Sequence, residues 1–309
     1  GDVHGCAHTL ERLLEQMGYR RLNGVWQHPR RQALFLGDII DRGPRIREAL
    51  HLVRDMVEAG QARCIMGNHE FNAICWETPA PPGSARSYLR EHTERHHRLI
   101  GDTLAQFDPW PQEWREFVQW FGDLPLFLDM GPFRLVHACW DSSLIEPLRQ
   151  DYPDGRIDDE FLIASAHWGS FPAQTFDRLL RGTDMRLPHG ITMTGKDGFT
   201  RAFFRTKFWE EAPETYGDVV FQPDALPEPV AEKPLTEQQK AELMIYQPHD
   251  PLLFVGHYWQ QGTPQPIRPN LACLDYSAVK YGKLVAYRWS GETRLERDHF
   301  VWVEVPQMS

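Results

Sequence analysis

Short apolar runs alternate with polar, turn-forming stretches along the chain. Ala33–Leu36, Ala62–Met66 and Phe133–Val136 each have the length of a buried strand, and Leu252–Val255 repeats the pattern much later. Apolar residues at helical spacing follow some of these runs. The helix predicted after Pro44 has an apolar face made of Ile46, Ala49, Leu50, Val53, Met56 and Val57.

The C-terminal part of the chain returns to strand patterns. These strands are predicted at Asn270–Ala278, Lys283–Trp289 and His299–Val305, with turns between them. Periodicity alone therefore predicts an α/β protein with a β-rich C-terminal part.

The segment Leu34–Pro44, LFLGDIIDRGP, lies where a predicted strand gives way to a helix. The strand ends at Gly37, and Asp38, Asp41 and Arg42 follow within five residues. Open α/β sheets place their ligand sites at such carboxyl ends of strands. Two Asp residues this close repel each other unless a cation or hydrogen bonds hold them. A plain turn with a helix cap accounts for one Asp, but it does not account for Arg42.

The other predicted strand ends also carry oxygen or imidazole groups. In the opening GDVHG, residues i and i+2 of an extended backbone point to the same side, so Asp2 and His4 can reach one ion. The motif GNHE places Asn68 and His69 after the strand Ala62–Met66. A single histidine after a strand is usually only a polar terminus. Five such strand ends are harder to dismiss, and their candidate ligands are Asp2, His4, Asp38, Asn68, His137 and His257.

This donor set of two carboxylates, one amide oxygen and three imidazoles suits two borderline divalent cations such as Mn, Fe or Zn. An all-oxygen Mg or Ca site would not need three histidines. Asp38, on the central turn, is the natural bridge between the ions. Two cations about 3.5–4 Å apart stabilise the attacking and leaving oxygens at phosphorus and lower the pKa of a bound water. Arg42 can hold the phosphate bidentately, His69 can protonate the leaving group, and Asp41 can orient that histidine.

Composition and charge narrow the class of protein. The chain has 309 residues and a net charge of −10, so extended binding to a nucleic-acid backbone is not expected. The five cysteines are scattered and never spaced as CxxC, which favours a reducing cytoplasm over a disulfide framework. No apolar run approaches a membrane span, so no membrane partner is expected. A strand is expected before GDVHG, and it would precede the given sequence.

Two long regions separate these motifs. Residues 76–130 and 141–250 are predicted to be insertions that form a cap or lid. Within HTERHH, the spacing of His92 and His96 could bind zinc on a helix, but a solvated helix face is favoured. Gln222–Thr236 is predicted to be an exposed connector or ordered loop.

GDVHG, GDIIDRGP, GNHE and the two later strand-end histidines, in this order, resemble the calcineurin-like metallophosphoesterases. The resemblance is closest to the serine/threonine protein phosphatase type and its bacterial relatives, which include diadenosine tetraphosphatases and the phosphatase module of polynucleotide kinase-phosphatase. It implies one domain over residues 1–309. Its fold would be an α/β/β/α sandwich of two mixed sheets flanked by helices, with helical insertions forming a cap.

The resemblance also implies roles for single residues. Asp2 and His4 would bind the first metal, Asp38 would bridge, and Asn68, His137 and His257 would bind the second. His69 would be the acid supported by Asp41, and Arg42 and Asn68 would contact the substrate phosphate. The protein phosphatases use a second phosphate-binding arginine between the two late histidines. Here Arg201 and Arg205 are candidates by position and charge, and a solvated basic strand explains them equally well.

The sequence therefore predicts a phosphatase that needs two divalent metals, most simply Mn²⁺, with Fe and Zn as alternatives. A metal-bridging hydroxide would attack a phosphomonoester in line, and the substrate could be a small molecule, a nucleotide or a phosphoprotein. The alternative is a dinucleoside polyphosphate or other nucleotide-pyrophosphate hydrolase that uses the same site. An inactive binding scaffold is disfavoured because every expected metal ligand is present.

Overall fold

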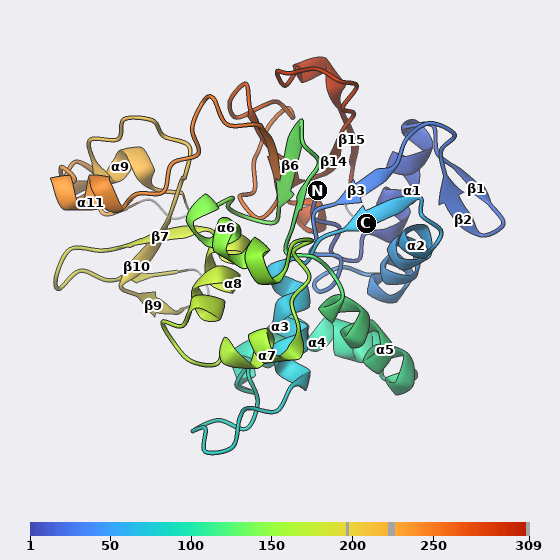
Figure 1. Ribbon diagram of the computed structural model, residues 1–309, viewed down its shortest axis with the longest axis horizontal. Coiled ribbons are helices and arrows are strands. Elements are labelled where there is room, and N and C mark those ends of the chain that lie inside the picture. Colours follow the sequence, from blue (N-terminus) through green and yellow to red (C-terminus); the bar gives the residue numbers. More distant parts are fainter. Residues whose placement is uncertain (196–197, 222–225, 307–309) are drawn as a thin grey trace.

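The computed structural model describes residues 1–195, 198–221 and 226–306. Its main sheet lies near the middle of the molecule, with helices around it (Figure 1). The strands, in their order across this sheet, are β12 (Leu271–Cys273), β11 (Leu252–Val255), β6 (Phe133–Val136) and β5 (Phe127–Asp129). β11 runs parallel to both of its neighbours, whereas β5 is antiparallel to β6. The sheet is therefore mixed.

A second sheet packs against one face of the first. It is antiparallel and contains β13 (Asp275–Tyr276), β14 (Lys283–Tyr287) and β15 (Phe300–Glu304). Leu252 and Phe254 of β11 share an apolar cluster with Val285 of β14 and Phe300 of β15. Because side chains alternate along a strand, the intervening residues of β11 belong instead to the main core. The expected mixed α/β class with packed sheets is confirmed.

The remaining strands form four smaller pairs or hairpins. Strands β3 (Ala33–Phe35) and β4 (Ala62–Cys64) are parallel. The antiparallel pairs are β1 (Arg20–Leu22) with β2 (Val25–Gln27), β7 (Thr183–Arg186) with β10 (Phe203–Thr206), and β8 (Met193–Thr194) with β9 (Thr200–Arg201). The prediction of one strand at Asn270–Ala278 is only partly correct. The segment contains two short strands, β12 and β13, and ends at the start of a 3-10 helix at Ala278–Lys280.

The helices of the N-terminal half are α1 (Ala7–Gln16), α2 (Ile46–Glu58), α3 (Asn68–Glu77), α4 (Glu94–Phe107) and α5 (Pro111–Gly122). The later helices are α6 (Ser142–Asp151), α7 (Asp159–Ala164), α8 (Phe171–Arg181), α9 (Tyr216–Val219), α10 (Glu228–Ala231) and α11 (Glu237–Glu242). Five of the six apolar positions predicted for α2 are buried, and Val57 is partly buried. The amphipathic pattern therefore identified both this helix and its inner face.

His92 and His96, the less favoured zinc alternative, do not share a face of α4. Thr93 caps the helix by accepting a hydrogen bond from the backbone N–H of His96, so His92 precedes the helix. The His92 ring stacks between Trp76 and Tyr88 at centroid distances of 3.7 and 4.0 Å. The zinc alternative therefore has no support from this geometry.

Both regions predicted to be insertions contain helices. Residues 76–130 contain α4, α5 and also β5 of the main sheet, and residues 141–250 contain α6–α11 and β7–β10. The second region has a small apolar cluster of its own, made of Leu187, Phe204, Tyr216, Val219, Leu226, Val230 and Leu235. In Figure 1 this part lies at the left, opposite α1 and α2. Residues 222–225 of the predicted connector Gln222–Thr236 lie outside the described residues, and the rest includes the short helix α10.

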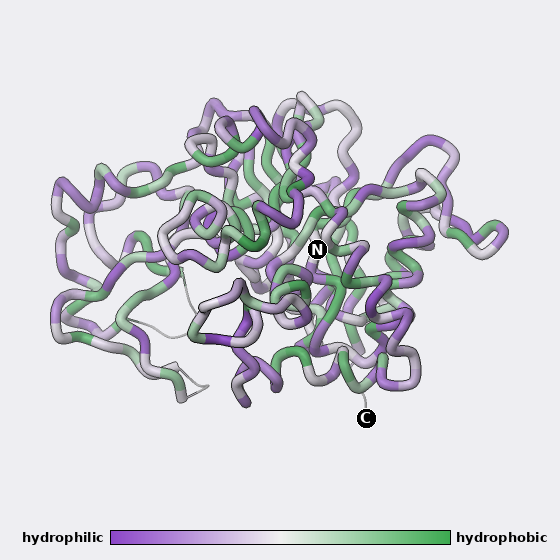
Figure 2. Tube along the Cα trace, turned by 60° about the horizontal axis from the view of Figure 1, so that its bottom comes forward, coloured by the Kyte–Doolittle hydropathy of each residue, from purple (hydrophilic) through white to green (hydrophobic). Residues whose placement is uncertain are grey.

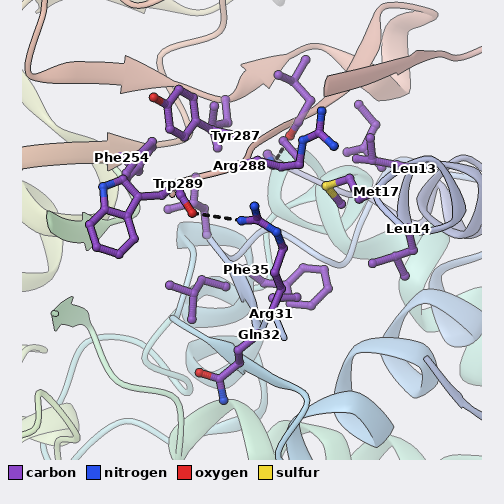
Figure 3. A pocket seen from close by; sticks show the side chains of 18 of the residues that line it. Leu13, Leu14, Met17, Arg31, Gln32, Phe35, Phe254, Tyr287, Arg288 and Trp289 are labelled. Carbon is purple, nitrogen blue, oxygen red and sulfur yellow. Dashed lines mark hydrogen bonds between the residues drawn. The ribbon is translucent and has the colours of Figure 1, made fainter. Parts of the chain in front are cut away.

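A largely apolar cavity of about 360 Å³ lies between α1, β3 and β14 (Figure 3). Arg31 lies at this cavity and donates from Nη1 to the carbonyl of Trp289 at 3.0 Å. The backbone nitrogen of Gly1 donates to the carbonyl of Val285 at 2.8 Å. Figure 2 shows hydrophobic stretches running through the middle of the molecule. None of the six candidate metal ligands lines this cavity, so it is separate from the polar strand ends.

Among the described residues, no helix is long and apolar enough to cross a membrane. All five cysteines are free and buried.

Candidate metal centre

Backbone hydrogen bonds bring the polar strand ends together. The N–H groups of Val3 and His4 both donate to the carbonyl of Asp38, at 3.0 and 2.9 Å. The N–H of Gly256 donates to the carbonyl of His137 at 2.8 Å, which joins the ends of β6 and β11. Asn68 begins α3 directly after the strand β4 and its short loop. Segments far apart in sequence therefore meet at one edge of the sheets.

Asp38 lies at the centre of this meeting point. Its Oδ2 is 3.2 Å from Nε2 of His137, 3.7 Å from Nε2 of His4 and 3.9 Å from Nε2 of His69. Two groups of donors could each hold an ion, and Asp38 belongs to both. One group is His4, Asp38 and His69, and the other is Asp38, His137 and His257. Asp41 belongs to neither group.

Asn68 and Asp2 complete the cluster. The Asn68 Oδ1 lies 2.9 Å from Nε2 of His137 and 3.1 Å from Nδ1 of His257. The Oδ2 of Asp2 accepts the backbone N–H of His257 at 3.3 Å. Asp2 lies outside both three-residue groups, but its other oxygen is buried without a hydrogen-bond partner, as is Nε2 of His257. Buried polar atoms without a partner are typical of sites that bind an ion or a water.

The backbone around these side chains adopts sparsely populated conformations. Asp38 has φ 54° and His257 has φ 61°, in the left-handed region that non-glycine residues rarely enter. The non-glycine residues with positive φ in this cluster are His4, Asp38, Asp41, Arg42 and His257. Strained residues persist where the surrounding structure holds them and cluster at functional sites.

Burial and mutual contact set the charges of the imidazoles. Burial, with His69 and Arg42 nearby, lowers the pKa of His4 to about 3, so this imidazole is neutral and able to ligate. Burial also lowers the pKa of His257 well below its ordinary value, and Arg205 adds to the effect. Burial disfavours the charged form of His137, but Asp38 outweighs it and raises its pKa to about 10. Asp38 is therefore the strongest favourable electrostatic influence on His137.

His69 is held from behind by an acid and a hydroxyl group. Its Nδ1 is 2.6 Å from Oδ2 of Asp41, and Oγ1 of Thr103 donates to the other oxygen of Asp41 at 2.6 Å. The backbone N–H of Asp41 in turn donates to Thr103. Burial opposes the charged form of His69, but Asp38 and the Asp41 hydrogen bond prevail and raise its pKa. This arrangement fixes the ring with Nε2 directed toward Asp38.

The candidate phosphate-binding arginines are electrostatic neighbours. Arg205, on β10, is partly buried, and its charge acts on His257. Burial lowers the pKa of Arg205, and both Arg201 and Arg42 lower it further. Arg42 is exposed beside the metal-ligand candidates and acts on His4. Arg42 therefore contributes positive charge to the same region as Arg201 and Arg205, which follow it by 159 and 163 positions in the sequence.

The residues present fit a pair of divalent cations. Imidazoles and carboxylates converge here, and both candidate groups share Asp38. Two buried atoms that could bind a metal, Oδ1 of Asp2 and Nε2 of His257, have no hydrogen-bond partner. None of the ligand candidates is a thiolate. The ring nitrogens facing away from the centre are also held, since Nδ1 of His4 lies 2.7 Å from the carbonyl of Ile40 and Nδ1 of His137 lies 2.7 Å from that of Leu36. Such outer hydrogen bonds orient metal-binding histidines.

Residues 1–187 match the calcineurin-like phosphoesterase family. The chain belongs to this family. The resemblance inferred from the motifs is thereby confirmed, and the match includes five of the six candidate metal ligands, since only His257 lies beyond it.

Relatives within the family include bacterial tetraphosphatases. The chain is 49% identical over 70 residues to the bis(5'-nucleosyl)-tetraphosphatase PrpE of Oceanobacillus iheyensis, a match that covers 22% of this chain and 28% of that protein. It is 31% identical over 166 residues to the PrpE protein of Geobacillus thermodenitrificans, covering 51% of this chain and 59% of that protein. The matches thus span less than two thirds of these relatives.

Solved structures similar to this phosphoesterase include two phosphatases. A serine/threonine phosphatase from Saccharomyces cerevisiae has a TM-score of 0.49 and 14% identity, over 100% of this chain and 79% of that chain. A cold-active protein-tyrosine phosphatase from a Shewanella species has a TM-score of 0.49 and 16% identity, over 99% and 78% of the two chains.

The sequence analysis did not identify two buried residues that support this calcineurin-like site, Glu70 and Thr103. Glu70 is fully buried, and its carboxylate accepts the backbone N–H groups of Asp38, Ile39 and Gly67 at 2.8, 2.8 and 3.0 Å. Its place in GNHE was visible, but only the folded loop reveals its partners. Thr103 comes from α4, where no motif marks it. Both residues hold groups that face the centre.

Replacing Glu70 with glutamine is expected to lower the free energy of unfolding by about 2–4 kcal/mol, because it sets an amide N–H against buried backbone donors. Chemical denaturation would measure the loss. Glu116→Gln is a matched control, since Glu116 is exposed on α5. An unchanged unfolding midpoint in Glu70→Gln would contradict the stabilising role of the Glu70 hydrogen bonds.

Proposed function

We propose that this chain is a metal-dependent phosphoester hydrolase with two divalent cations at the centre around Asp38. The observation that carries the proposal is the membership of Asp38 in two donor groups at once. When bound, the cations would supply a water of lowered pKa and neutralise charge on the phosphoryl oxygens. The orphaned atoms of Asp2 and His257 support the same reading.

The proposed metal ligands divide around this shared carboxylate. Asp2 and His4 would hold one ion, whereas Asn68, His137 and His257 would hold the other. His69 is near enough to Asp38 to be counted with the first group, but its bond to Asp41 supports a different role. We assign His69 as the acid that protonates the leaving oxygen, with Asp41 as its positioning residue.

The proposed phosphate contacts are cationic and amide side chains. Arg42 lies in a loop, and its guanidinium is exposed. A guanidinium can bind two phosphate oxygens at once. Asn68 and the arginines Arg201 and Arg205 would assist, because the charge of Arg205 already acts on His257. Residues 76–130 and 141–250 would form a cap on a single domain, and the second region's own apolar cluster supports this division.

A phosphomonoester is the simplest substrate for such a centre. A second candidate is a dinucleoside polyphosphate, and the names of the PrpE relatives favour it. Three histidines in the ligand set favour Mn²⁺, Fe or Zn over Mg²⁺ or Ca²⁺. Five free cysteines fit a reducing compartment such as the cytoplasm.

Metal analysis tests the dinuclear centre directly. After Mn²⁺ is added to the metal-free protein and excess removed, two ions per chain are expected, with hydrolysis of p-nitrophenyl phosphate restored in parallel. Chelation should reverse both effects. A single bound ion at full activity would refute the dinuclear proposal.

A further inference from the structure

Two arginines gather beside the outer part of α3, beyond the candidate metal ligands. Asn72 lies three positions after His69 and four after Asn68, so it shares a face of α3 with them. Arg181, at the end of α8, donates from Nη2 to Oδ1 of Asn72 at 2.7 Å. The Arg181 guanidinium also lies 5.5 Å from the centre of the Phe71 ring. This arginine is therefore held one helical turn away from the centre.

Arg90 reaches the same place from the first insertion. Its backbone N–H donates to the carbonyl of Cys75, one turn further along α3, at 2.9 Å. Its side chain is partly buried, and burial together with the nearby charge of Arg181 lowers its pKa to about 10. Asp41 is close enough to act in the opposite direction. The backbone contact with Cys75 thus anchors Arg90 to α3, and its charge interacts with both Arg181 and Asp41.

Nearby acids balance the positive charge of this arginine pair only in part. Arg90 forms no ion pair with any acidic residue in the described ranges. Arg181 is 3.6 Å from Asp177, whose side chain is 59% exposed and therefore screened by water. Asp41 is already bonded to His69 and Thr103. Two partly buried guanidinium groups that share one solvent-exposed carboxylate can still bind a planar or tetrahedral anion.

We propose that Arg90 and Arg181 form a second anion subsite, on the His69 side of the metal centre, that holds a phosphate group of the leaving group. The proposal rests on the proposed function and narrows its substrate class to phosphoanhydrides with a phosphorylated leaving group. Because Arg181 is anchored to Asn72 of α3, the subsite has a fixed position relative to Asn68 and His69.

The reaction at such a substrate is a balanced hydrolysis. The oxygen of water forms a bond to the attacked phosphorus, and the bond from that phosphorus to the bridging oxygen breaks. The bridging oxygen keeps the electron pair and leaves as part of a phosphate anion, while the proton of water is released. Since a phosphate has a second pKa near about 6, this leaving group needs positive charge more than it needs a proton.

Two substrates with different leaving groups test the subsite. Arg90→Gln and Arg181→Gln are each expected to lower kcat/KM for diadenosine tetraphosphate by about 10- to 100-fold. The same variants should hydrolyse p-nitrophenyl phosphate within about twofold of the parent, because that leaving group carries no phosphate. Arg115→Gln is the matched control, since Arg115 is exposed on α5 and its guanidinium donates to Oε1 of Gln112. Equal losses on both substrates, or no loss on either, would overturn the proposal.

A binding measurement separates this proposal from the proposed function. The metal-free double variant Arg90→Gln/Arg181→Gln should bind inorganic tripolyphosphate at least about tenfold more weakly than the metal-free parent. If the parent hydrolyses neither substrate with Mn²⁺, the proposed function fails, and this difference in Kd would still uphold the subsite. An unchanged Kd would reject it, whatever the activity.

Discussion

The Asp38→Asn variant is expected to lose hydrolysis of p-nitrophenyl phosphate by about 10³-fold or more, the scale seen when a central catalytic group is removed. Asp38 places Oδ2 within 3.2–3.9 Å of three imidazoles, and both donor groups depend on it. An amide keeps the shape of the side chain but removes the negative charge that two cations would share. We expect both metal sites to weaken together.

Initial rates with Mn²⁺ and calorimetric titration of the metal would measure this effect. Asp55→Asn is a matched control, because Asp55 is exposed on α2. Near-native rates in Asp38→Asn would reject Asp38 as the bridge. A variant that binds one ion normally and loses the other would instead assign Asp38 to a single site. Because Oδ1 of Asp38 accepts the backbone N–H of His69 at 3.0 Å, a thermal melt should accompany the assay.

Local patterns were sufficient to predict the elements on which the centre is built. The apolar spacing of α2 identified the helix after LFLGDIIDRGP, and the four buried runs became strands β3, β4, β6 and β11. Side chains at the ends of parallel strands meet because the sheet orders the strands. Hence residues as distant as His4 and His257 could be grouped from sequence before any distance was known.

Long-range contacts could not be predicted in the same way. Thr103 meets Asp41 across 62 positions, and Arg181 meets Asn72 across 109. No periodicity or motif encodes the packing of α4 against Asp41 or of α8 against α3. His92 illustrates the converse, since its spacing from His96 left a zinc pair on a helix as the less favoured alternative, but α4 begins only after the N-cap Thr93. Turn chemistry outweighed the helical spacing at that position.

The His69→Ala variant should distinguish substrates by their leaving groups. For an alkyl phosphate monoester, whose alkoxide must be protonated, kcat is expected to fall by about 10²–10⁴-fold, the usual contribution of a general acid. For p-nitrophenyl phosphate the loss should be much smaller, because p-nitrophenolate leaves without a proton. The geometry behind this expectation is the 2.6 Å contact between Nδ1 of His69 and Asp41, which leaves Nε2 for the substrate side. Steady-state rates on the two substrates would measure the difference.

Companion variants decide whether His69 acts as an acid or only as a structural group. Asp41→Asn should reproduce the leaving-group dependence in weaker form, because Asp41 acts through His69, whereas His8→Ala on the exposed face of α1 should change neither rate. Equal losses on both substrates would reject the acid role and favour metal binding by His69 in the group with His4 and Asp38.

Diadenosine tetraphosphate provides a third substrate for comparison, since departure of its phosphate leaving group should depend little on His69 but strongly on Arg90 and Arg181. A substrate sensitive to the arginines but not to the histidine would assign leaving-group stabilisation to positive charge, and the opposite pattern would assign it to proton transfer.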